Sequence, residues 1–273
     1  MVIGAVLSNR MATRLSDVDA LHWSTPFVLA LVVFIIYTVD RLLDVQKDPT
    51  RQPSTARHRF HRQHAPLLWR LVIGACLLTG VLVFFLPGSV IRFGLLLGAV
   101  CAAYVGAVFR LPAHHPALLL KEPLVAVLYS AGVWGSVWVQ RPSVCWIDMV
   151  EGLLFTAIAF QNLLLFAVME QLEANGQSKR QSTQPAVRLF SLATYWGLAA
   201  CDRILRWLTF GIMITSFVLC FLTNDRFAQR SALMLALMSL TLYGIQRYPA
   251  YFLKNERYRW LGDGVFWMPA LVL

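Results

Sequence analysis

The apolar run of residues 27–39 continues without a turn residue into Asp40-Arg41-Leu42-Leu43-Asp44-Val45-Gln46-Lys47-Asp48. The three carboxylates of this stretch are four residues apart, so they share one face of a helix. Like charges at this spacing repel each other. A row of them at the end of a hydrophobic helix therefore indicates a bound cation, and oxygen ligands of this kind suit Mg²⁺. Pro49 predicts that the helix ends just beyond the last carboxylate.

The alternative interpretation of this stretch is a set of solvated charges at a membrane surface. Arg41 and Lys47 would then balance the carboxylates. Ionisable residues beside a membrane span are nevertheless functional candidates, and we carry both interpretations forward.

The composition predicts an integral membrane protein that is all α-helical. Of 273 residues, 58% are hydrophobic and only 14% are charged, far from the usual balance of a soluble domain. A membrane span needs about 20 apolar residues. We expect spans, some of them short, in eight segments of one domain (1–273): residues 25–39, 67–86, 91–109, 118–139, 147–169, 204–222, 231–245 and 261–273.

The basic residues predict the orientation of these spans. If each segment crosses once, 18 of the 24 Lys and Arg residues fall in loops on one side. Positively charged loops remain in the cytoplasm, so we predict a bacterial inner-membrane protein with the aspartate stretch on the cytoplasmic side. The net charge of +10 is then a topology signal and gives no support to a nucleic-acid partner.

Two local patterns make further predictions. Gly94 and Gly98 are four residues apart, a spacing that permits close helix contact in lipid. Residues 175–184 are rich in Gln, Ser and Thr and predict a polar linker after the fifth span.

The aspartate stretch resembles the first acidic motif of the UbiA-type intramembrane prenyltransferases, Asn-Asp-x-x-Asp-x-x-x-Asp. In this chain Asp40 takes the Asn place, and Arg41 replaces the first Asp. Asp44 and Asp48 match the remaining two positions.

A second stretch is similar to the family's second motif, Tyr-Asp-x-x-Tyr-x-x-x-Asp-x-x-Asp-Asp, in a degraded form. Asn162 and Phe166 take the two Tyr places, and Glu170 and Glu173 take two of the Asp places. The other acids are replaced by Leu163 and Ala174. Family members also carry a Lys-Arg pair before the fourth span, where this chain has Lys121 and Glu122.

The resemblance implies a bundle of about eight or nine transmembrane helices around a central cavity. It also implies Mg²⁺-dependent transfer of a prenyl group from a polyprenyl diphosphate to an acceptor, aromatic or lipid, within the membrane. The implied metal ligands are Asp40, Asp44, Asp48, Glu170 and Glu173. The implied substrate-binding residues are Arg57, Lys121, Asn162, Lys179 and Arg180.

Two other functions stay open. The chain could ionise a prenyl diphosphate and then cyclise or hydrolyse it without a separate acceptor. It could also be a non-enzymatic descendant of the fold that binds membrane lipids or acts as a scaffold.

Overall fold

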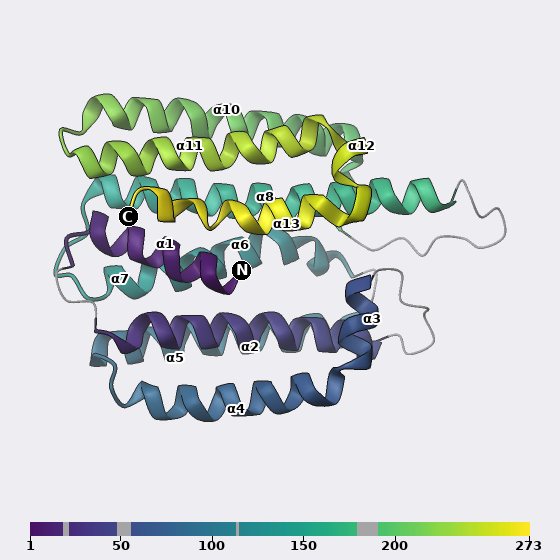
Figure 1. Ribbon diagram of the computed structural model, residues 1–273, viewed down its shortest axis with the longest axis horizontal. Coiled ribbons are helices and arrows are strands. Elements are labelled where there is room, and N and C mark those ends of the chain that lie inside the picture. Colours follow the sequence, from purple (N-terminus) through teal and green to yellow (C-terminus); the bar gives the residue numbers. More distant parts are fainter. Residues whose placement is uncertain (19–21, 48–55, 113–114, 179–190) are drawn as a thin grey trace.

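The computed structural model describes residues 1–18, 22–47, 56–112, 115–178 and 191–273, which form helices and short connections with no strand among them (Figure 1). The long helices are α2 (Ser24–Lys47), α4 (Ala65–Val83), α5 (Gly88–Arg110), α8 (Trp146–Ser178), α10 (Leu198–Leu222) and α11 (Arg226–Arg247). The shorter ones are α1 (Val2–Leu15), α3 (Ala56–Gln63), η1 (Pro116–Leu120), α6 (Lys121–Ser130), η2 (Ala131–Gly135), α7 (Ser136–Trp138), α9 (Leu192–Trp196), α12 (Pro249–Phe252), η3 (Lys254–Glu256), α13 (Arg257–Val265) and η4 (Met268–Leu271).

Six helical stretches are long and apolar enough to cross a membrane. They are Ser24–Leu43, Ala65–Val83, Gly88–Val108, Pro116–Trp138, Trp146–Gly176 and Leu198–Leu222. Helices are expected here because lipid offers no hydrogen-bond partners to the backbone. The predicted segment 231–245 lies in α11, and the segment 261–273 is divided between α13 and η4. Neither of these two is among the six candidate spans.

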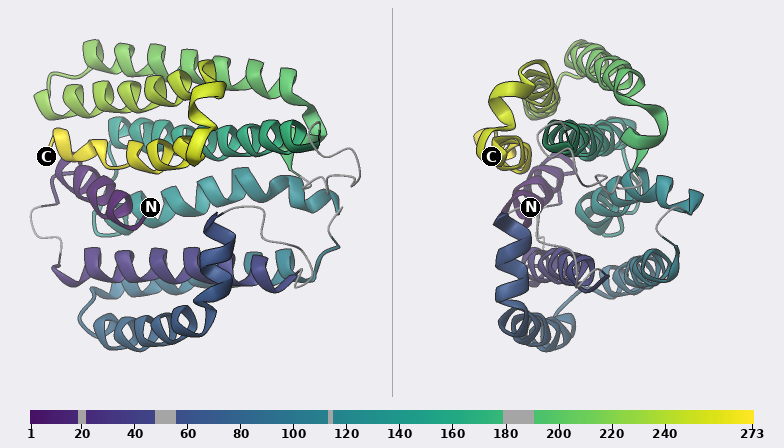
Figure 2. Two further views of the ribbon diagram at one scale, coloured as in Figure 1. Left: turned by 45° about the vertical axis from the view of Figure 1, so that its right-hand side comes forward. Right: turned by 90° about the vertical axis from the view of Figure 1, so that its right-hand side faces the viewer.

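Helix α8 is the centre of the bundle. Within its apolar window 67% of the residues are buried, against 6–28% for the other five candidate spans. Figure 2 shows α10 and α11 on one side of α8, and α2, α4 and α5 on the other. The helix continues to Ser178, so residues 175–178 are helical and not the linker that their composition predicts. Asn and Gly have low helix propensity, and the preceding buried turns override it.

A buried amide joins α8 to two neighbours. Gln161 donates a hydrogen bond to Thr209 Oγ1 of α10 at 2.9 Å and to the Ser239 carbonyl of α11 at 3.2 Å. Its own oxygen accepts a hydrogen bond from Ser239 Oγ at 2.8 Å. Polar pairs of this kind hold helices together where lipid provides no hydrophobic driving force.

Helix α1 packs against a widened turn in the fourth span. Residues 131–135 form a π-helical turn, a geometry that disturbs the regular hydrogen-bond ladder. The Asn9 amide enters there and donates to the Val133 carbonyl at 2.7 Å and to Ser136 Oγ at 3.1 Å. At the end of α1, Ser16 Oγ donates to Asp148 at 3.0 Å, and Arg141 pairs with the same carboxylate at 3.2 Å. Side-chain bonds thus fix this short helix to α7 and α8.

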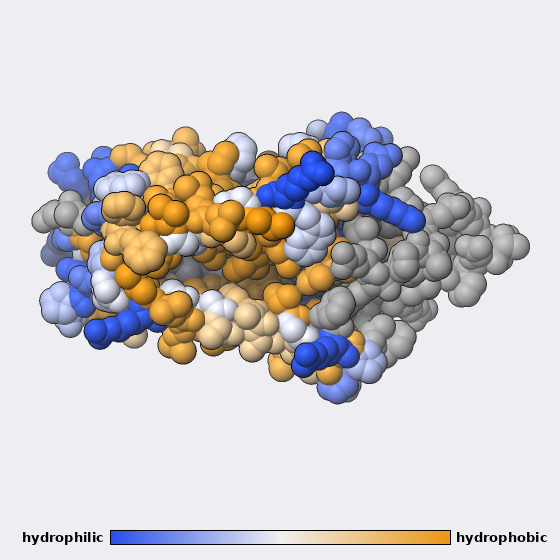
Figure 3. All heavy atoms as spheres, turned by 90° about the horizontal axis from the view of Figure 1, so that it is seen from below, coloured by the Kyte–Doolittle hydropathy of each residue, from blue (hydrophilic) through white to orange (hydrophobic). Residues whose placement is uncertain are grey.

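Helices α4 and α5 leave most of their side chains exposed. A Cβ atom at Gly94 or Gly98 would meet no atom within 4 Å, so no close helix contact forms at this pair within the described chain. The spacing permits an approach but supplies no neighbouring helix. Figure 3 views the side of α4 and shows a mainly apolar face, hollowed near its middle, with polar residues gathered at the ends.

The connections between helices gather at two ends of the bundle. In Figure 1 the end of α2, the start of α6, the end of α8 and the start of α13 all lie at the right-hand end. The α4–α5, α7–α8 and α10–α11 connections lie at the left-hand end. The described parts of the loops that the basic residues assign to one side therefore share one end of the molecule.

Candidate functional site

Asp40 lies near the last turns of α2, and Lys121 lies in the first turn of α6. Lys121 Nζ is 3.9 Å from Asp40 Oδ1, while the guanidinium of Arg41 is 3.6 Å from Asp40 Oδ2. Arg41 also stacks against the ring of Tyr37 at 5.6 Å. Both ion pairs are long and partly exposed, so they contribute little stability.

The structure covers five other predicted site residues only in part or not at all. The backbone of Asp44 belongs to α2 and that of Arg57 to α3, but their side chains lie outside the described part. Asp48, Lys179 and Arg180 lie outside the described residues altogether. Their roles as metal ligands or diphosphate contacts stay predictions.

The second acidic motif faces α13. Arg259 Nη2 donates a hydrogen bond of 2.7 Å to Glu170 Oε1. Its Nε lies 3.1 Å from Glu256 Oε2, an ion pair without hydrogen-bond alignment. The Arg259 side chain is only 12% exposed, against 34% for Glu170. We call Glu170, Arg259 and Glu256 the α8–α13 cluster.

The α8 part of this cluster belongs to a row of residues that are four positions apart and lie on one face of the helix. Asn162, Phe166 and Glu170 repeat at this spacing and so face one neighbour, which is α13. The ring of Phe166 meets that of Tyr258 edge-on at 5.7 Å. A Cβ at Gly262 would lie 2.6 Å from Asn162 Oδ1 and 2.5 Å from Phe166 Cε1. Only glycine therefore lets α13 approach α8 this closely.

Asn162 is fully buried, and within the described chain neither of its side-chain polar atoms has a hydrogen-bond partner. It lies eight residues before Glu170, which places it about 12 Å deeper along the helix. Buried amides without partners are rare. The side chain packs against Gly262 of α13, and the predicted role of Asn162 in binding a substrate stays a prediction.

Burial and neighbouring charges shift the pKa values of two residues on the α13 side of the cluster. Burial raises the pKa of the Tyr258 phenol; the positive charge of Arg259 opposes this shift, and the acids Glu170, Glu173 and Glu256 add to it. Burial disfavours the charged form of Arg259, but Glu170 first, then Tyr258 and Glu256, outweigh it and raise the pKa of the guanidinium. Arg259 is thus a permanent positive charge in a largely dry position.

Glu122 lies between the two acidic motifs. Its carboxylate accepts a hydrogen bond from the backbone N–H of Leu192, at the start of α9, at 3.4 Å. It also lies within electrostatic range of Lys121 and Glu170. An acid at this position therefore links α6 to α9 beside α8.

A divalent ion fits the two motifs unequally. Mg²⁺ usually binds proteins through one or two carboxylates, with the substrate phosphates completing the shell. Asp40, with its two distant cations, can supply such a ligand, whereas one oxygen of Glu170 is engaged by Arg259. In the part of the chain that the structure describes, no three His, Cys, Asp or Glu side chains form a metal-binding group. That part does not include the side chains of Asp44 and Asp48.

Sequence reasoning did not find the partnership of Glu170 with Arg259. The two residues are 89 positions apart, and a helix pattern reports only on neighbours three or four positions away. The available signal was the basic and aromatic character of residues 254–260, which marks an interface without identifying its partner.

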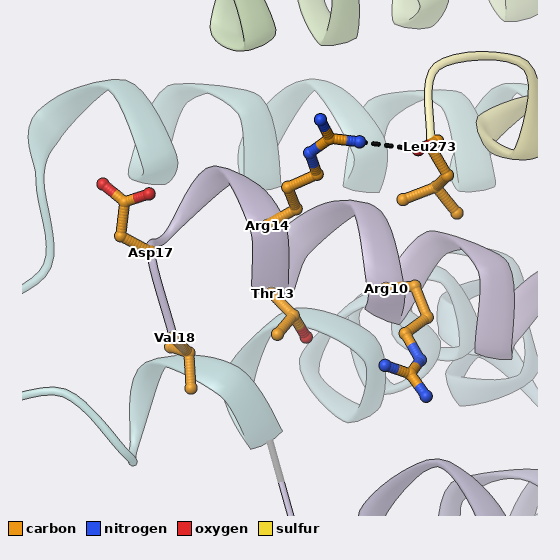
Figure 4. Close-up of a pocket in the computed structure, with 6 residues that line it drawn as sticks. All are labelled: Arg10, Thr13, Arg14, Asp17, Val18 and Leu273. Carbon is orange, nitrogen blue, oxygen red and sulfur yellow. Dashed lines mark hydrogen bonds between the residues drawn. The ribbon is translucent and has the colours of Figure 1, made fainter. Parts of the chain in front are cut away.

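A separate pocket of about 310 Å³ lies at the opposite end, beside α1 (Figure 4). It is lined by Arg10, Thr13, Arg14, Asp17, Val18 and Leu273. Arg14 donates a 2.6 Å hydrogen bond to the Leu273 carbonyl, and Figure 4 shows that Arg10 points to the other side of the helix. Because the two guanidinium groups diverge, they do not form one anion site.

Comparisons of the chain with protein-family models, with curated proteins and with solved structures gave no match. The resemblance of the two acidic motifs to the UbiA-type family remains a prediction.

Proposed function

We propose that this chain transfers a prenyl group from a polyprenyl diphosphate to an aromatic or lipid acceptor, in the manner of the UbiA-type enzymes. The observation that carries the proposal is the position of Asp40 beside Lys121 at the end of a membrane helix. The α8–α13 cluster lies at the same end of the bundle. An acidic and a basic group at the mouth of an apolar helix bundle suit a ligand with a charged head and a long apolar tail.

The proposed mechanism assigns separate tasks to the two regions. Asp40, Asp44 and Asp48 would hold Mg²⁺, which neutralises the charge of the leaving diphosphate. Lys121, with Arg57, Lys179 and Arg180, would contact the phosphate oxygens and stabilise the charge that builds on them. Asn162 would lie deeper, against the substrate. We propose that the apolar hollow in Figure 3 belongs to a central cavity of a bundle of about eight or nine helices.

That cavity would shelter the prenyl chain and keep water from the allylic cation left when the diphosphate departs. Without a separate acceptor, the same cation would be cyclised or hydrolysed, which is the closest alternative reaction. Product analysis with and without candidate acceptors separates the two.

A non-enzymatic lipid-binding or scaffold role is favoured by one observation. Glu170 already has an internal counter-ion in Arg259, so this acid needs no metal for its charge to be balanced. A protein that kept the bundle and lost catalysis would have the same arrangement.

The test is diphosphate release from geranyl, farnesyl and geranylgeranyl diphosphates by the protein in membranes, with and without Mg²⁺. We expect Mg²⁺-dependent release that falls by about 100-fold or more in Asp44→Ala, the size of effect seen when transition-state charge loses its stabilisation. Asp202→Ala is the matched control, because this acid at the same end pairs with Arg206 on α10. Equal release by both variants would contradict the assignment. Binding of a non-cleavable analogue without any release would favour the lipid-binding role.

A further inference from the structure

The two acidic motifs of this chain differ in how their charge is already balanced. At the first motif, among the side chains that the structure describes, two cations lie 3.6 and 3.9 Å from Asp40, and the Lys121 side chain is 36% exposed. At the second motif Arg259 donates a charge-assisted hydrogen bond of 2.7 Å to Glu170, a strong class of contact. Long, partly exposed ion pairs are weak, whereas displacing a buried guanidinium that makes a short hydrogen bond is costly.

The position of Arg259 is fixed by several independent contacts. Glu256, one turn earlier on the same segment, pairs with its Nε at 3.1 Å. The guanidinium also lies over the rings of Tyr258 at 5.0 Å and Phe166 at 6.0 Å. These contacts come from both α8 and α13, so moving the guanidinium would disturb the interface that Gly262 brings into close contact.

A metal ion at Glu170 would compete directly with this guanidinium. Mg²⁺ binds carboxylate oxygen at 2.0–2.1 Å, so an ion on Oε1 would lie within about 5 Å of the Arg259 nitrogen that contacts the same atom. Two cations this close in a poorly hydrated position repel each other strongly. Displacing Arg259 would instead leave it buried without its principal partner, which is also costly.

We propose that Arg259 is a built-in cation that takes the place of a metal ion at Glu170, so that this carboxylate holds no divalent ion. This inference rests on the proposed function, which assigns the divalent ion to the first acidic motif. The charge of a bound diphosphate would then be met by that ion and by the fixed guanidinium on α13.

The experiment counts divalent-ion sites with Mn²⁺ as the probe, by electron paramagnetic resonance on the full chain in nanodiscs. Wild type is compared with Asp44→Ala, Glu170→Gln, Arg259→Gln and the double variant Glu170→Gln/Arg259→Gln. Arg257→Gln is the matched control, because Arg257 lies on the same helix but stacks on Tyr251 at 4.6 Å.

We expect one site in wild type, lost in Asp44→Ala and unchanged in Glu170→Gln and Arg257→Gln. Arg259→Gln should gain one further site, because its removal frees Glu170, and the double variant should lack that site. A second wild-type site that disappears in Glu170→Gln would overturn the inference, as would a folded Arg259→Gln with no additional site.

Glu170→Gln tests occupancy in the presence of Arg259, so the inference stays testable if Arg259→Gln does not fold. Failure of the proposed function gives a different result. If the metal assignment at the first acidic motif fails, wild type binds no Mn²⁺, while Arg259→Gln still gains a site that depends on Glu170; if only catalysis fails, the Mn²⁺ counts stay as expected and no diphosphate is released.

Discussion

Gly262 lets α13 lie close to α8 because it has no Cβ atom. Gly262→Ala would push a methyl group into Asn162 and Phe166, and we expect it to destabilise the fold by about 1–3 kcal/mol, the usual cost of overpacking. Gly264→Ala on the same helix is the control, because a Cβ there meets no atom within 4 Å. Thermal unfolding in detergent measures both, and equal midpoints for the two variants would contradict the close approach.

Tyr258 makes stability depend on alkaline pH. Burial raises its pKa above the ordinary value of 10.0, so the unfolded chain loses this proton at a lower pH than the folded chain. The stabilisation is complete below pH 10 and is lost as the pH rises through the folded-state pKa. We expect the free energy of unfolding to fall above pH 10 more steeply in wild type than in Tyr258→Phe. Parallel pH profiles for the two proteins would argue against this role.

At the residue scale, the sequence identified candidate site residues better than it identified their contact partners. The spacing of Asp40 and Asp44 and the pair Glu170 and Glu173 were visible as helical patterns. The contact of Glu170 with Arg259 was not, because it depends on where a distant helix packs.

At the scale of elements, Gln161 is the clearest test of how the bundle is assembled. Gln161→Leu removes its hydrogen bonds to α10 and α11, and we expect a loss of about 1–2 kcal/mol, in line with polar contacts between membrane helices. Gln140→Leu is the control, since within the described residues that amide bonds to the Ser136 carbonyl of its own turn and to no other helix. Steric trapping or thermal unfolding would show the difference in stability. Equal stability of the two variants would mean that other contacts hold α8 to α10 and α11.

Helix existence was predictable where apolar runs are long, as in α2, α4 and α5. Contact faces were less so, because glycine spacing reports what a helix permits and not what lies beside it, as Gly94 and Gly98 illustrate. Helix α8 extends past its apolar run because the buried turns before residue 175 carry the helix forward. The π-helical turn at residues 131–135 had no sequence signal, and the Asn9 amide that hydrogen-bonds to it is more than a hundred positions away.

At the scale of the whole molecule, the two ends make orientation measurable. Cys145 is exposed in the α7–α8 connection, at the end opposite the site. If the basic loops are cytoplasmic, a membrane-impermeant maleimide should label Cys145 in intact cells. A cysteine replacing Lys254 should react only after the membrane is opened. Cys145→Ser gives the background, and the reverse labelling pattern would invert the predicted orientation.

The distribution of basic residues predicted which loops share an end, because charge selects the side of the membrane before helices pack. It could not predict that α8 lies at the centre, since the apolar window of α8 is no more hydrophobic than those of α2 and α4. Centrality depends on packing partners, which hydropathy does not encode.

Because the helices are buried to different extents, they also differ in how many amino-acid substitutions they tolerate. Most positions of α4 and α5 face outward, where any apolar side chain of suitable length satisfies the surrounding hydrocarbon. Buried side chains of α8 pack against several neighbouring helices, so a substitution there requires a compensating substitution in a neighbour. Random mutagenesis with selection for folded protein should therefore leave α4 and α5 diverse and α8 almost unaltered.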